Sequence, residues 1–185
     1  INLVLSGGVV VYWYARCKRA LAQACAQTPA PVVLDLGCGT LRLARNLSRH
    51  VPNVRLLGLD PSRAMLARGL SRLNPAVRQG LLVVQGEAAA LPFPDSSLDC
   101  VVSQFVWRNL PSRPEALAEI RRVLKPGGQL LIMEFACGLI PVWGGLYNFY
   151  LRRVLPRLAA LFSPRKKAYD YLVQSILAFP QPETI

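Results

Sequence analysis

The sequence predicts an α/β protein in which a parallel β-sheet carries helices on both faces. Five short apolar stretches, each typical of a buried strand, alternate along the chain with stretches of helical periodicity. Parallel strands need such crossover helices, and ligands of this architecture gather at the carboxyl ends of the strands. With 185 residues, 52% of them hydrophobic, the chain is long enough to build one sizeable core.

Each element follows from a local pattern. A helix over about residues 9–27 ends at the Thr-Pro-Ala-Pro break of residues 28–31. Later helices are expected over residues 40–50, from Pro61–Ser62 onward, and from a Ser-x-x-Glu capping box at Ser112 to about Leu124. The expected strands cover residues 32–36, 54–59, 81–84, 98–103 and 130–135, and a Lys-Pro-Gly-Gly turn over residues 125–128 precedes the last one.

The first strand runs into a glycine-rich turn, Asp35-Leu-Gly37-Cys-Gly39-Thr40. Glycines let the backbone approach a bound molecule closely, and a following helix start presents free N–H groups. A dinucleotide fingerprint would need a third glycine where Arg42 stands, so nicotinamide and flavin cofactors are disfavoured. The turn is better suited to a nucleoside ligand that lacks a pyrophosphate.

Acidic groups follow the next two strands at positions that suit a nucleoside. Asp60 comes directly after the second strand, where its carboxylate can accept hydrogen bonds from both ribose hydroxyls. A helix-capping role is the alternative for Asp60. Glu87 and Ala88 follow the third strand, where an acid can accept a hydrogen bond from an adenine amino group and a backbone N–H can meet a ring nitrogen.

The fourth strand is followed by an Arg-Asn pair, Arg108 and Asn109. Polar side chains directly after a buried strand are positioned to contact a ligand that binds at the carboxyl ends of the strands. The alternative is a structural salt bridge between Arg108 and a carboxylate such as Asp95 or Asp99.

Composition limits the partners of the protein. The net charge of +12 is explained equally well by a solvated basic surface, and it also suits contact with an anionic membrane surface or with nucleic acid. Interleaved aromatic residues or a nucleic-acid motif would favour the latter, and neither is found, so no nucleic acid is expected. Five cysteines without a Cys-x-x-Cys pair argue against a disulfide framework and against a metal site, and they indicate a reducing compartment.

The segment after residue 136 interrupts the strand–helix alternation. Residues 143–162 form an apolar helical stretch, followed by the basic cluster Arg165, Lys166 and Lys167. We expect it to lie in the membrane interface without spanning the bilayer. The expected location is cytoplasmic, peripheral on the inner face of the membrane, or on the matrix side of a mitochondrial membrane.

Further motifs are spread over nearly the whole chain. They are Asn2-x-x-Leu5-Ser6-x-Gly8 followed by Trp13, Asp60-x-Ser62-x-x-Met65-Leu66, Leu91-Pro-Phe-Pro-Asp95, Arg108-Asn109, Arg122-Val-Leu-Lys-Pro-Gly-Gly128, Glu134-Phe135, and a distal set that includes Tyr147-x-Phe149-Tyr150 and Phe179-Pro180. The glycine turn resembles motif I of the class I S-adenosylmethionine (SAM) methyltransferases. The whole set resembles the menaquinone and ubiquinone C-methyltransferase family, for which the Arg-Asn pair, the Glu-Phe pair and the distal set are the more specific features.

This resemblance implies the Rossmann-like fold of class I methyltransferases, with SAM as the cofactor. It implies that an enzyme of this kind transfers a methyl group from SAM to a ring carbon of a polyprenylated quinol, either a demethylmenaquinol or a benzoquinol precursor of ubiquinone. The residues expected to bind SAM are Asp35, Gly37, Gly39, Thr40, Asp60, Glu87, Ala88 and Gln104. Arg108 and Asn109 are the expected catalytic residues, Arg108 to stabilise the quinolate oxygen and Asn109 to orient it or a water.

Some positions depart from the family pattern. Leu41 replaces a glycine, and Val106-Trp107 replaces a Gly-Leu pair before Arg108. The antiparallel strand pair that completes the seven-stranded family sheet is expected to be missing, which leaves a sheet of about five strands. Its exposed edge would be available to a second copy of the chain or to another protein.

These features predict one methyltransferase domain over residues 1–185. Its parts are an N-terminal helical segment (1–30), a SAM-binding α/β core (31–136) and a helical segment that faces substrate and membrane (137–185). Two other functions stay open: a catalytically silent subunit that binds SAM or lipid in a membrane assembly, suggested by Leu41 and Val106, and a methyltransferase for another small acceptor.

Overall fold

The computed structural model describes residues 9–47, 51, 53–134 and 153. The strands form one sheet in the order β3-β2-β1-β4-β5, and every pairing between them is parallel. They are β1 (Val32–Leu36), β2 (Arg55–Asp60), β3 (Leu81–Gln85), β4 (Leu98–Gln104) and β5 (Leu124–Met133). The helices are α2 (Val9–Ala24), α3 (Ala44–Leu47), α4 (Arg63–Leu70), α5 (Pro75–Gln79), the 3₁₀-helix η1 (Trp107–Asn109) and α6 (Arg113–Val123).

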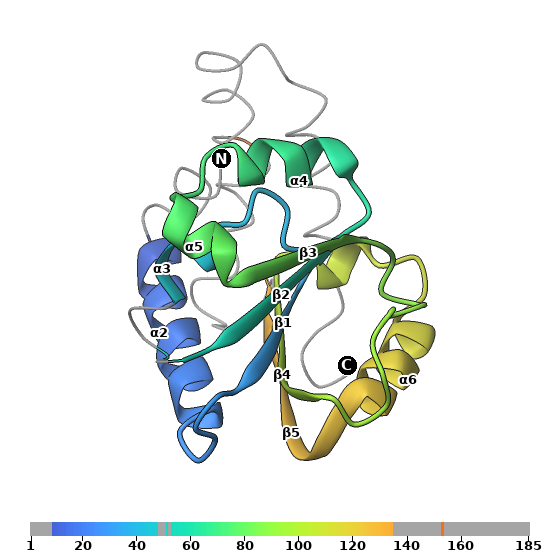
Figure 1. Ribbon diagram of the computed structural model, residues 1–185. Helices are drawn as coiled ribbons and strands as arrows, with labels where there is room; N and C mark the ends of the chain where they lie inside the picture. The colour runs from blue at the N-terminus through green and yellow to red at the C-terminus, as the bar shows by residue number, and fades with distance from the viewer. Residues whose placement is uncertain (1–8, 48–50, 52, 135–152, 154–185) are drawn as a thin grey trace. The chain divides into compact units, whose positions relative to one another are not determined.

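The predicted parallel sheet with helices on both faces is confirmed. Side chains of a strand alternate between its two faces, and Val33 of β1 therefore shares a buried cluster with Leu21 of α2 and Leu47 of α3. Leu34 and Leu36, on the other face of β1, are equally buried. Figure 1 shows α2 and α3 on one side of the sheet and α6 on the other. Because both faces are covered, the strand is apolar nearly throughout.

The starts of α4 and α6 follow the predicted caps. The Oγ of Ser62 accepts a hydrogen bond from the N–H of Met65 at 3.3 Å, and α4 begins one residue after Ser62. The Oγ of Ser112 accepts one from the N–H of Glu115 at 3.4 Å, as the capping box predicts for α6. Both caps satisfy backbone donors that a helix start leaves without partners.

Two element boundaries were predicted wrongly. The helix expected from residue 40 begins only at Ala44, because Leu41 has a φ of 58°, in the left-handed region that a right-handed helix cannot contain. The turn expected over residues 125–128 is part of β5, which begins at Leu124 and contains a register shift where it pairs with Leu98–Cys100.

The helix α5 was not predicted, although its start carries a recognisable signal. The Oδ1 of Asn74 accepts a hydrogen bond from the N–H of Ala76 at 2.9 Å, and Pro75 occupies the first turn of the helix. The helix has only five residues, too few for a periodic apolar pattern to stand out.

Residues Tyr12–Met133 form one compact unit, which contains the whole described sheet. A second unit consists of Ile1–Val11 and Glu134–Ile185, of which residues 9–11, 134 and 153 are described. The predicted apolar helix over residues 143–162 and its basic cluster lie outside the described residues, and the three-part division of the chain stays a prediction. Among the helices that are described, none combines the length and the hydrophobicity needed to cross a bilayer.

Candidate functional site

The register of the sheet brings the carboxyl ends of three strands to one edge. Leu36, the last residue of β1, pairs with Leu59 of β2 on one side and with Ser103 of β4 on the other. Asp60 and Gln104, which come directly after these two partners, therefore lie at the same edge as the glycine turn.

Asp60 attaches the glycine turn to the end of β2. Its Oδ2 accepts a hydrogen bond from the N–H of Gly39 at 2.8 Å, and its Oδ1 accepts one from the N–H of Ser62 at 2.9 Å. The N-cap of α4 is Ser62 and not Asp60, so Asp60 does not have the helix-capping role that was considered for it. Each carboxylate oxygen has a second lone pair, so Asp60 keeps acceptor capacity for a ligand.

The glycine turn has a backbone that only glycine adopts easily. Gly37 has a φ of 70° and Gly39 a φ of 52°. The N–H groups of Gly37 and Cys38 both donate to the carbonyl of Leu59, at 2.7 and 3.0 Å. A Cβ added to Gly37 would lie 2.3 Å from Cγ2 of Val106, in the segment after β4. The turn is therefore in close contact with both neighbouring strand ends.

Leu41, one of the departures from the family pattern, is a core residue. It is fully buried, and its Cδ2 lies 3.2 Å from the position that a Cβ would take on Gly58 of β2. Its Cγ lies 2.9 Å from the corresponding position on Gly69 of α4. The side chain of Leu41 thus fills the space that two glycines leave open.

Asp35 is the second acid of the site. It is buried at the end of β1, and its carboxylate accepts no hydrogen bond from the described part of the chain. Burial and the nearby Asp60 raise the pKa of Asp35 to about 7. Burial makes the ionised carboxylate of Asp35 unfavourable by itself, so a cation bound beside Asp35 would stabilise the ionised form.

The segment after β4 leaves the strand through a strained residue. Phe105 has a φ of 61°, which costs a non-glycine residue on the order of 1–2 kcal/mol. Its N–H donates to the carbonyl of Met133 at 2.7 Å, and its own carbonyl accepts from Nη1 of Arg108 at 3.1 Å. The N–H of Asn109 donates to the carbonyl of Val106 at 2.8 Å. These local hydrogen bonds connect the Arg-Asn pair to the segment that leaves β4.

Neither carboxylate considered as a structural partner of Arg108 pairs with it. Asp95 forms its ion pair with Arg122 at 2.6 Å, and Asp99 forms one with Lys125 at 2.8 Å. These two ion pairs exclude Asp95 and Asp99 as the structural partner of Arg108.

Glu87 and Ala88 lie beyond β3, at the neighbouring strand end. The side chain of Glu87 is exposed and Ala88 is partly buried. The N–H of Gly86 donates to the carbonyl of Asp60 at 3.3 Å, which ties this segment to the end of β2. Thr40, in the glycine turn, is partly buried.

The loop between this segment and β4 is held by an arginine of α6. Arg122 donates to the carbonyls of Leu91 and Phe93, both at 2.9 Å, and to carboxylate oxygens of Asp95 and Glu119. Glu119 in turn accepts from the N–H of Leu91 at 2.7 Å. These two contacts, first with Arg122 and then with Leu91, lower the pKa of Glu119 to about 2.

The helix α2 contributes contacts that the sequence did not predict. Nε2 of Gln104 donates to Sγ of Cys17 at 3.2 Å. The ring of Tyr14 meets the ring of Phe105 edge to face, with the ring centres 5.9 Å apart, and the guanidinium of Arg42 lies 4.0 Å from the centre of the Tyr14 ring. No sequence motif marks these residues, because each contact joins segments that are far apart along the chain.

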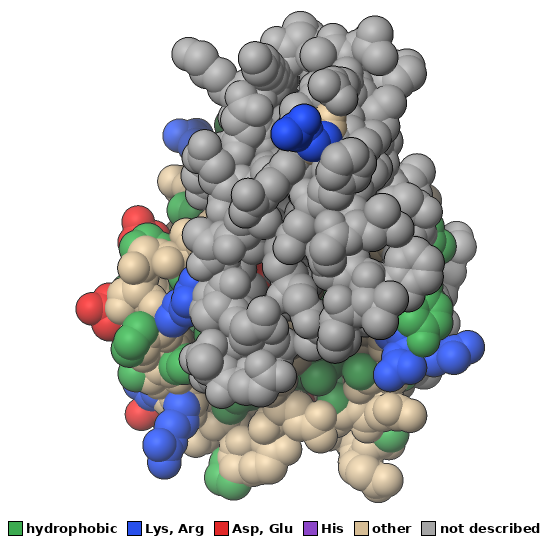
Figure 2. Space-filling model, turned by 180° about the vertical axis from the view of Figure 1, so that it is seen from behind, with side chains coloured by type: hydrophobic (Ala, Val, Ile, Leu, Met, Phe, Trp, Pro, Cys, Tyr) green, Lys and Arg blue, Asp and Glu red, His purple; other side chains and the backbone are tan. Residues whose placement is uncertain are grey.

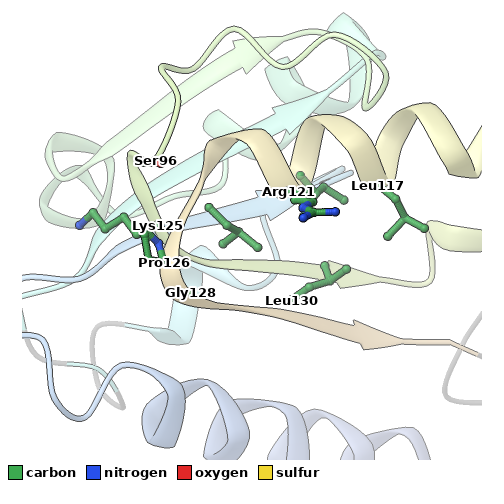
Figure 3. A pocket seen from close by; sticks show the side chains of 9 residues that line it. Ser96, Leu117, Arg121, Lys125, Pro126, Gly128 and Leu130 are labelled. Carbon is green, nitrogen blue, oxygen red and sulfur yellow. The ribbon is translucent and has the colours of Figure 1, made fainter.

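A separate cavity of about 480 Å³ lies between α6 and the start of β5. Figure 3 shows Leu117 and Arg121 of α6 above it and Leu130 of β5 below it. Because it contains the amino end of a parallel strand, this cavity belongs to the edge of the sheet opposite the candidate site. We therefore do not assign it to the cofactor.

A comparison with known families identifies the group of proteins to which the chain is related. The family model described as "ubiE/COQ5 methyltransferase family" matches residues 1–185. The chain belongs to the ubiE/COQ5 methyltransferase family. It is accordingly a methyltransferase, and its cofactor is SAM.

Two relatives from the ubiE/COQ5 family illustrate the similarity. The chain is 39% identical over 186 residues to the demethylmenaquinone methyltransferase of Deinococcus radiodurans, an alignment that covers all of this chain and 75% of the relative. It is 36% identical over 185 residues to the ubiquinone/menaquinone biosynthesis C-methyltransferase UbiE of Paracoccus denitrificans, covering all of this chain and 72% of the relative.

A solved structure shares the fold of this ubiE/COQ5 family member. The YcgJ protein of Bacillus subtilis superposes with a TM-score of 0.60 at 25% sequence identity. The superposition covers 76% of this chain and 58% of the YcgJ chain. The Rossmann-like fold expected from the sequence is thereby confirmed.

Proposed function

We propose that this protein methylates a ring carbon of a polyprenylated quinol in quinone biosynthesis, with SAM as the methyl donor. The names of the relatives, demethylmenaquinone methyltransferase and ubiquinone/menaquinone biosynthesis C-methyltransferase, support the acceptor class. The structural observation that carries the proposal is the single sheet edge shared by Asp60, the glycine turn and the segment with Arg108.

The donor set at this edge fits SAM. Asp60 would accept hydrogen bonds from the ribose hydroxyls with its remaining lone pairs, while its present bonds to Gly39 and Ser62 hold it in place. SAM is a cation at its sulfonium and carries an ammonium group, and Asp35 is a buried carboxylate without a described hydrogen bond. A positive group beside Asp35 would supply the missing stabilisation.

The other SAM contacts follow from the positions of the remaining residues. Glu87 and Ala88, at the end of β3, would meet the adenine ring. Gly37 and Thr40 of the turn and Gln104 of β4 would line the path between the adenosine and the reacting methyl group. This assignment of contacts is part of the proposal.

At the acceptor end, the bound cofactor supplies an electrophilic methyl group. The quinol ring carbon can attack it only if electron density is available, so the quinol hydroxyl must lose its proton and the oxyanion must be stabilised. Arg108 stays protonated and is therefore a poor base but a good partner for the oxyanion. Asn109 would orient that oxygen, or a water molecule that carries the proton away. The ring carbon would take up the methyl group with release of S-adenosylhomocysteine and then lose its ring proton. The quinolate oxygen would be protonated again to restore the quinol, so one proton is released overall.

Methyl transfer from radiolabelled SAM tests the proposal. Demethylmenaquinol in detergent should become labelled, whereas an unprenylated small phenol should not. Label on other small acceptors but on no quinol would contradict the acceptor class. Calorimetry with S-adenosylhomocysteine (SAH) separates this outcome from a failure to bind the cofactor.

We also propose that the protein works at an anionic membrane surface, where a polyprenyl acceptor resides. The net charge of +12 supports this location. On the face seen in Figure 2, Lys and Arg side chains appear at several separate places around the described surface. The predicted segment 137–185, with its apolar stretch and basic cluster, is the proposed contact with substrate and membrane.

A further inference from the structure

We infer that Tyr14 is a positioning residue whose ring connects the glycine turn of the cofactor site to the segment that carries Arg108. The connection, here called the aromatic bridge, consists of Arg42, Tyr14 and Phe105. The inference rests on the proposed function, because it assigns the two ends of the bridge to cofactor and acceptor.

The first contact joins the bridge to the glycine turn. The guanidinium carbon of Arg42 lies 4.0 Å from the centre of the Tyr14 ring, well within the range of a cation–π interaction. Arg42 directly follows Leu41, whose backbone is left-handed and whose side chain is locked in the core. The position of Arg42 is therefore coupled to the conformation of the turn that runs from Gly37 to Thr40.

The second contact joins the bridge to the acceptor side. The rings of Tyr14 and Phe105 meet at 78° with their centres 5.9 Å apart, a favourable edge-to-face geometry. Phe105 is held in a strained conformation, and its carbonyl accepts the hydrogen bond from Arg108. A ring that packs against Phe105 therefore acts, through one backbone carbonyl, on the placement of the Arg108 guanidinium.

The helix that carries Tyr14 does not depend on the bridge for its own packing. Further along α2, Cys17, Leu21 and Cys25 are all buried in the core cluster. Tyr14 is only half-buried, and its ring lies between two segments of the site. Removal of the ring should therefore leave the fold intact and affect the relation between the two segments.

The test compares Tyr14→Leu, Tyr14→Phe and Arg42→Gln with the wild-type chain. Tyr14→Leu should lower kcat with demethylmenaquinol about 10-fold, weaken SAH binding about 2- to 5-fold, and change the melting temperature little. Tyr14→Phe keeps an aromatic face and edge and should restore both quantities. Arg42→Gln should weaken SAH binding by itself but add little in the Tyr14→Leu background, since the two residues make one contact.

Tyr12→Leu is the matched control. Tyr12 lies on the same helix, and the guanidinium of Arg16 lies 5.9 Å from its ring centre and donates to its hydroxyl at 3.2 Å. This pair is exposed, with 58% of Tyr12 accessible, so its loss should leave SAH binding and kcat unchanged.

Two results would overturn the aromatic bridge. One is a Tyr14→Leu variant with normal kcat and SAH affinity, and the other is a loss of activity that Tyr14→Phe does not restore. Strictly additive effects of Tyr14→Leu and Arg42→Gln on SAH affinity would also count against it. If the wild-type chain binds SAH but methylates no quinol, the proposed acceptor is wrong, and the SAH double-mutant cycle still decides whether Tyr14 and Arg42 are coupled.

Discussion

Arg108 is the residue on which the proposed chemistry depends most directly. Its guanidinium donates to the carbonyl of Phe105 and has no bridge to Asp95 or Asp99, both of which pair elsewhere. We expect Arg108→Ala to lower the rate of methyl transfer about 10²-fold or more. This is the effect typical of removing one preorganised hydrogen-bond donor to an oxyanion. SAH affinity and melting temperature should change little.

Rates, SAH titrations and thermal melts on one purified Arg108→Ala preparation check this prediction. Arg121→Ala, on the exposed surface of α6, serves as the control for removal of an arginine. A variant that unfolds easily but turns over normally per folded molecule would mean that Arg108 has a structural role instead.

Asp60 should contribute more to cofactor affinity than Glu87 does. Asp60→Ala removes the proposed acceptors for the ribose hydroxyls and also the bond to Gly39 that holds the glycine turn. We expect SAM binding to weaken by about 1.5–3 kcal/mol, the range for a hydrogen bond to a charged group. Glu87→Ala should cost less, because Glu87 is exposed and only its one proposed contact with the adenine is lost. Calorimetry on the two variants is the measurement, and normal binding by Asp60→Ala would place the cofactor elsewhere.

The ionisation of Asp35 should make the stability of the cofactor-free protein depend on pH. Burial raises its pKa from 3.8 to about 7, so the folded state holds this proton more tightly than the unfolded chain does. This stabilisation is fully present below the pKa that Asp35 has in the unfolded chain. It is lost as the pH rises through the pKa that Asp35 has in the folded state. The free energy of unfolding should therefore fall between about pH 4 and pH 8, and Asp35→Asn should reduce that fall.

Denaturant titrations across this pH range, with and without SAM, test the role of Asp35. Asp60, Cys17 and Cys38 are the titratable groups that interact with it, and all are retained in Asp35→Asn, as is the single His50. A positive cofactor favours the ionised carboxylate, so SAM should bind the wild-type chain more tightly as the pH rises. An unchanged pH profile in Asp35→Asn would show that another group causes it.

At the scale of elements, the glycine turn and the segment after β4 fit each other closely. Gly37→Ala would place a methyl group 2.3 Å from Cγ2 of Val106, in a backbone conformation that alanine avoids. We expect a loss of about 2 kcal/mol or more in the free energy of unfolding, together with weaker SAH binding.

The double variant Gly37→Ala with Val106→Gly should recover part of that loss. It removes the clash but leaves the backbone strain at residue 37. Gly39→Ala is the control, because its nearest neighbour would be Cε of Met65 at 3.5 Å and only the strain, about 1 kcal/mol, applies. If Gly37→Ala lowers the free energy of unfolding equally in the wild-type chain and in the Val106→Gly variant, the side chain of Val106 moves aside without cost. Denaturant unfolding measures all three variants.

Most strands and caps could be predicted from sequence because their causes are local. The apolar runs of β1 and β2, the cap at Ser62 and the capping box at Ser112 are each contained within a few residues. The late start of α3 could not be predicted, because it depends on Leu41 adopting a left-handed backbone so that its side chain reaches Gly58 and Gly69.

The candidate site divides in the same way. Asp35, Asp60 and the glycine turn are recognisable because each lies at or directly after the carboxyl end of a strand, and a parallel sheet places these ends together. Tyr14 and Arg42 carry no motif, and the partner of each comes from a distant segment. The pairing of Asp95 with Arg122 and of Asp99 with Lys125 likewise depends on how α6 and the start of β5 pack, so only the structure could separate them from Arg108.

At the scale of the whole molecule, charge should govern binding to membranes. We expect the protein to sediment with vesicles that contain anionic phospholipid and to be released by salt, with roughly 1 kcal/mol contributed by each basic residue near the surface. The predicted contact is the stretch 143–162 with the basic cluster Arg165, Lys166 and Lys167.

A triple Gln variant of that cluster should weaken vesicle binding more than a triple Gln variant of Arg63, Arg68 and Arg72, which are exposed on and just after α4. Equal weakening would assign the effect to total charge and not to the C-terminal segment. Binding that ignores both salt and lipid charge would contradict the proposed membrane surface altogether.

The strand order also has a kinetic consequence. β1 pairs with β2, its neighbour in sequence, and with β4, which is distant: the N–H of Val32 donates to Asp99, 67 positions further along the chain. The segments β1-β2-β3 and β4-α6-β5 can each assemble through short connections. The pairing of β1 with β4, here called the seam, joins the two segments. Forming the seam costs more loop-closure entropy, because a longer stretch of chain separates these two strands. Gly37 on one side of this seam and Val106 on the other complete the edge to which we assign the cofactor, so neither half forms it alone. We therefore expect nascent chains to acquire SAM affinity only when the seam closes, and bound cofactor to slow the opening of that seam during unfolding.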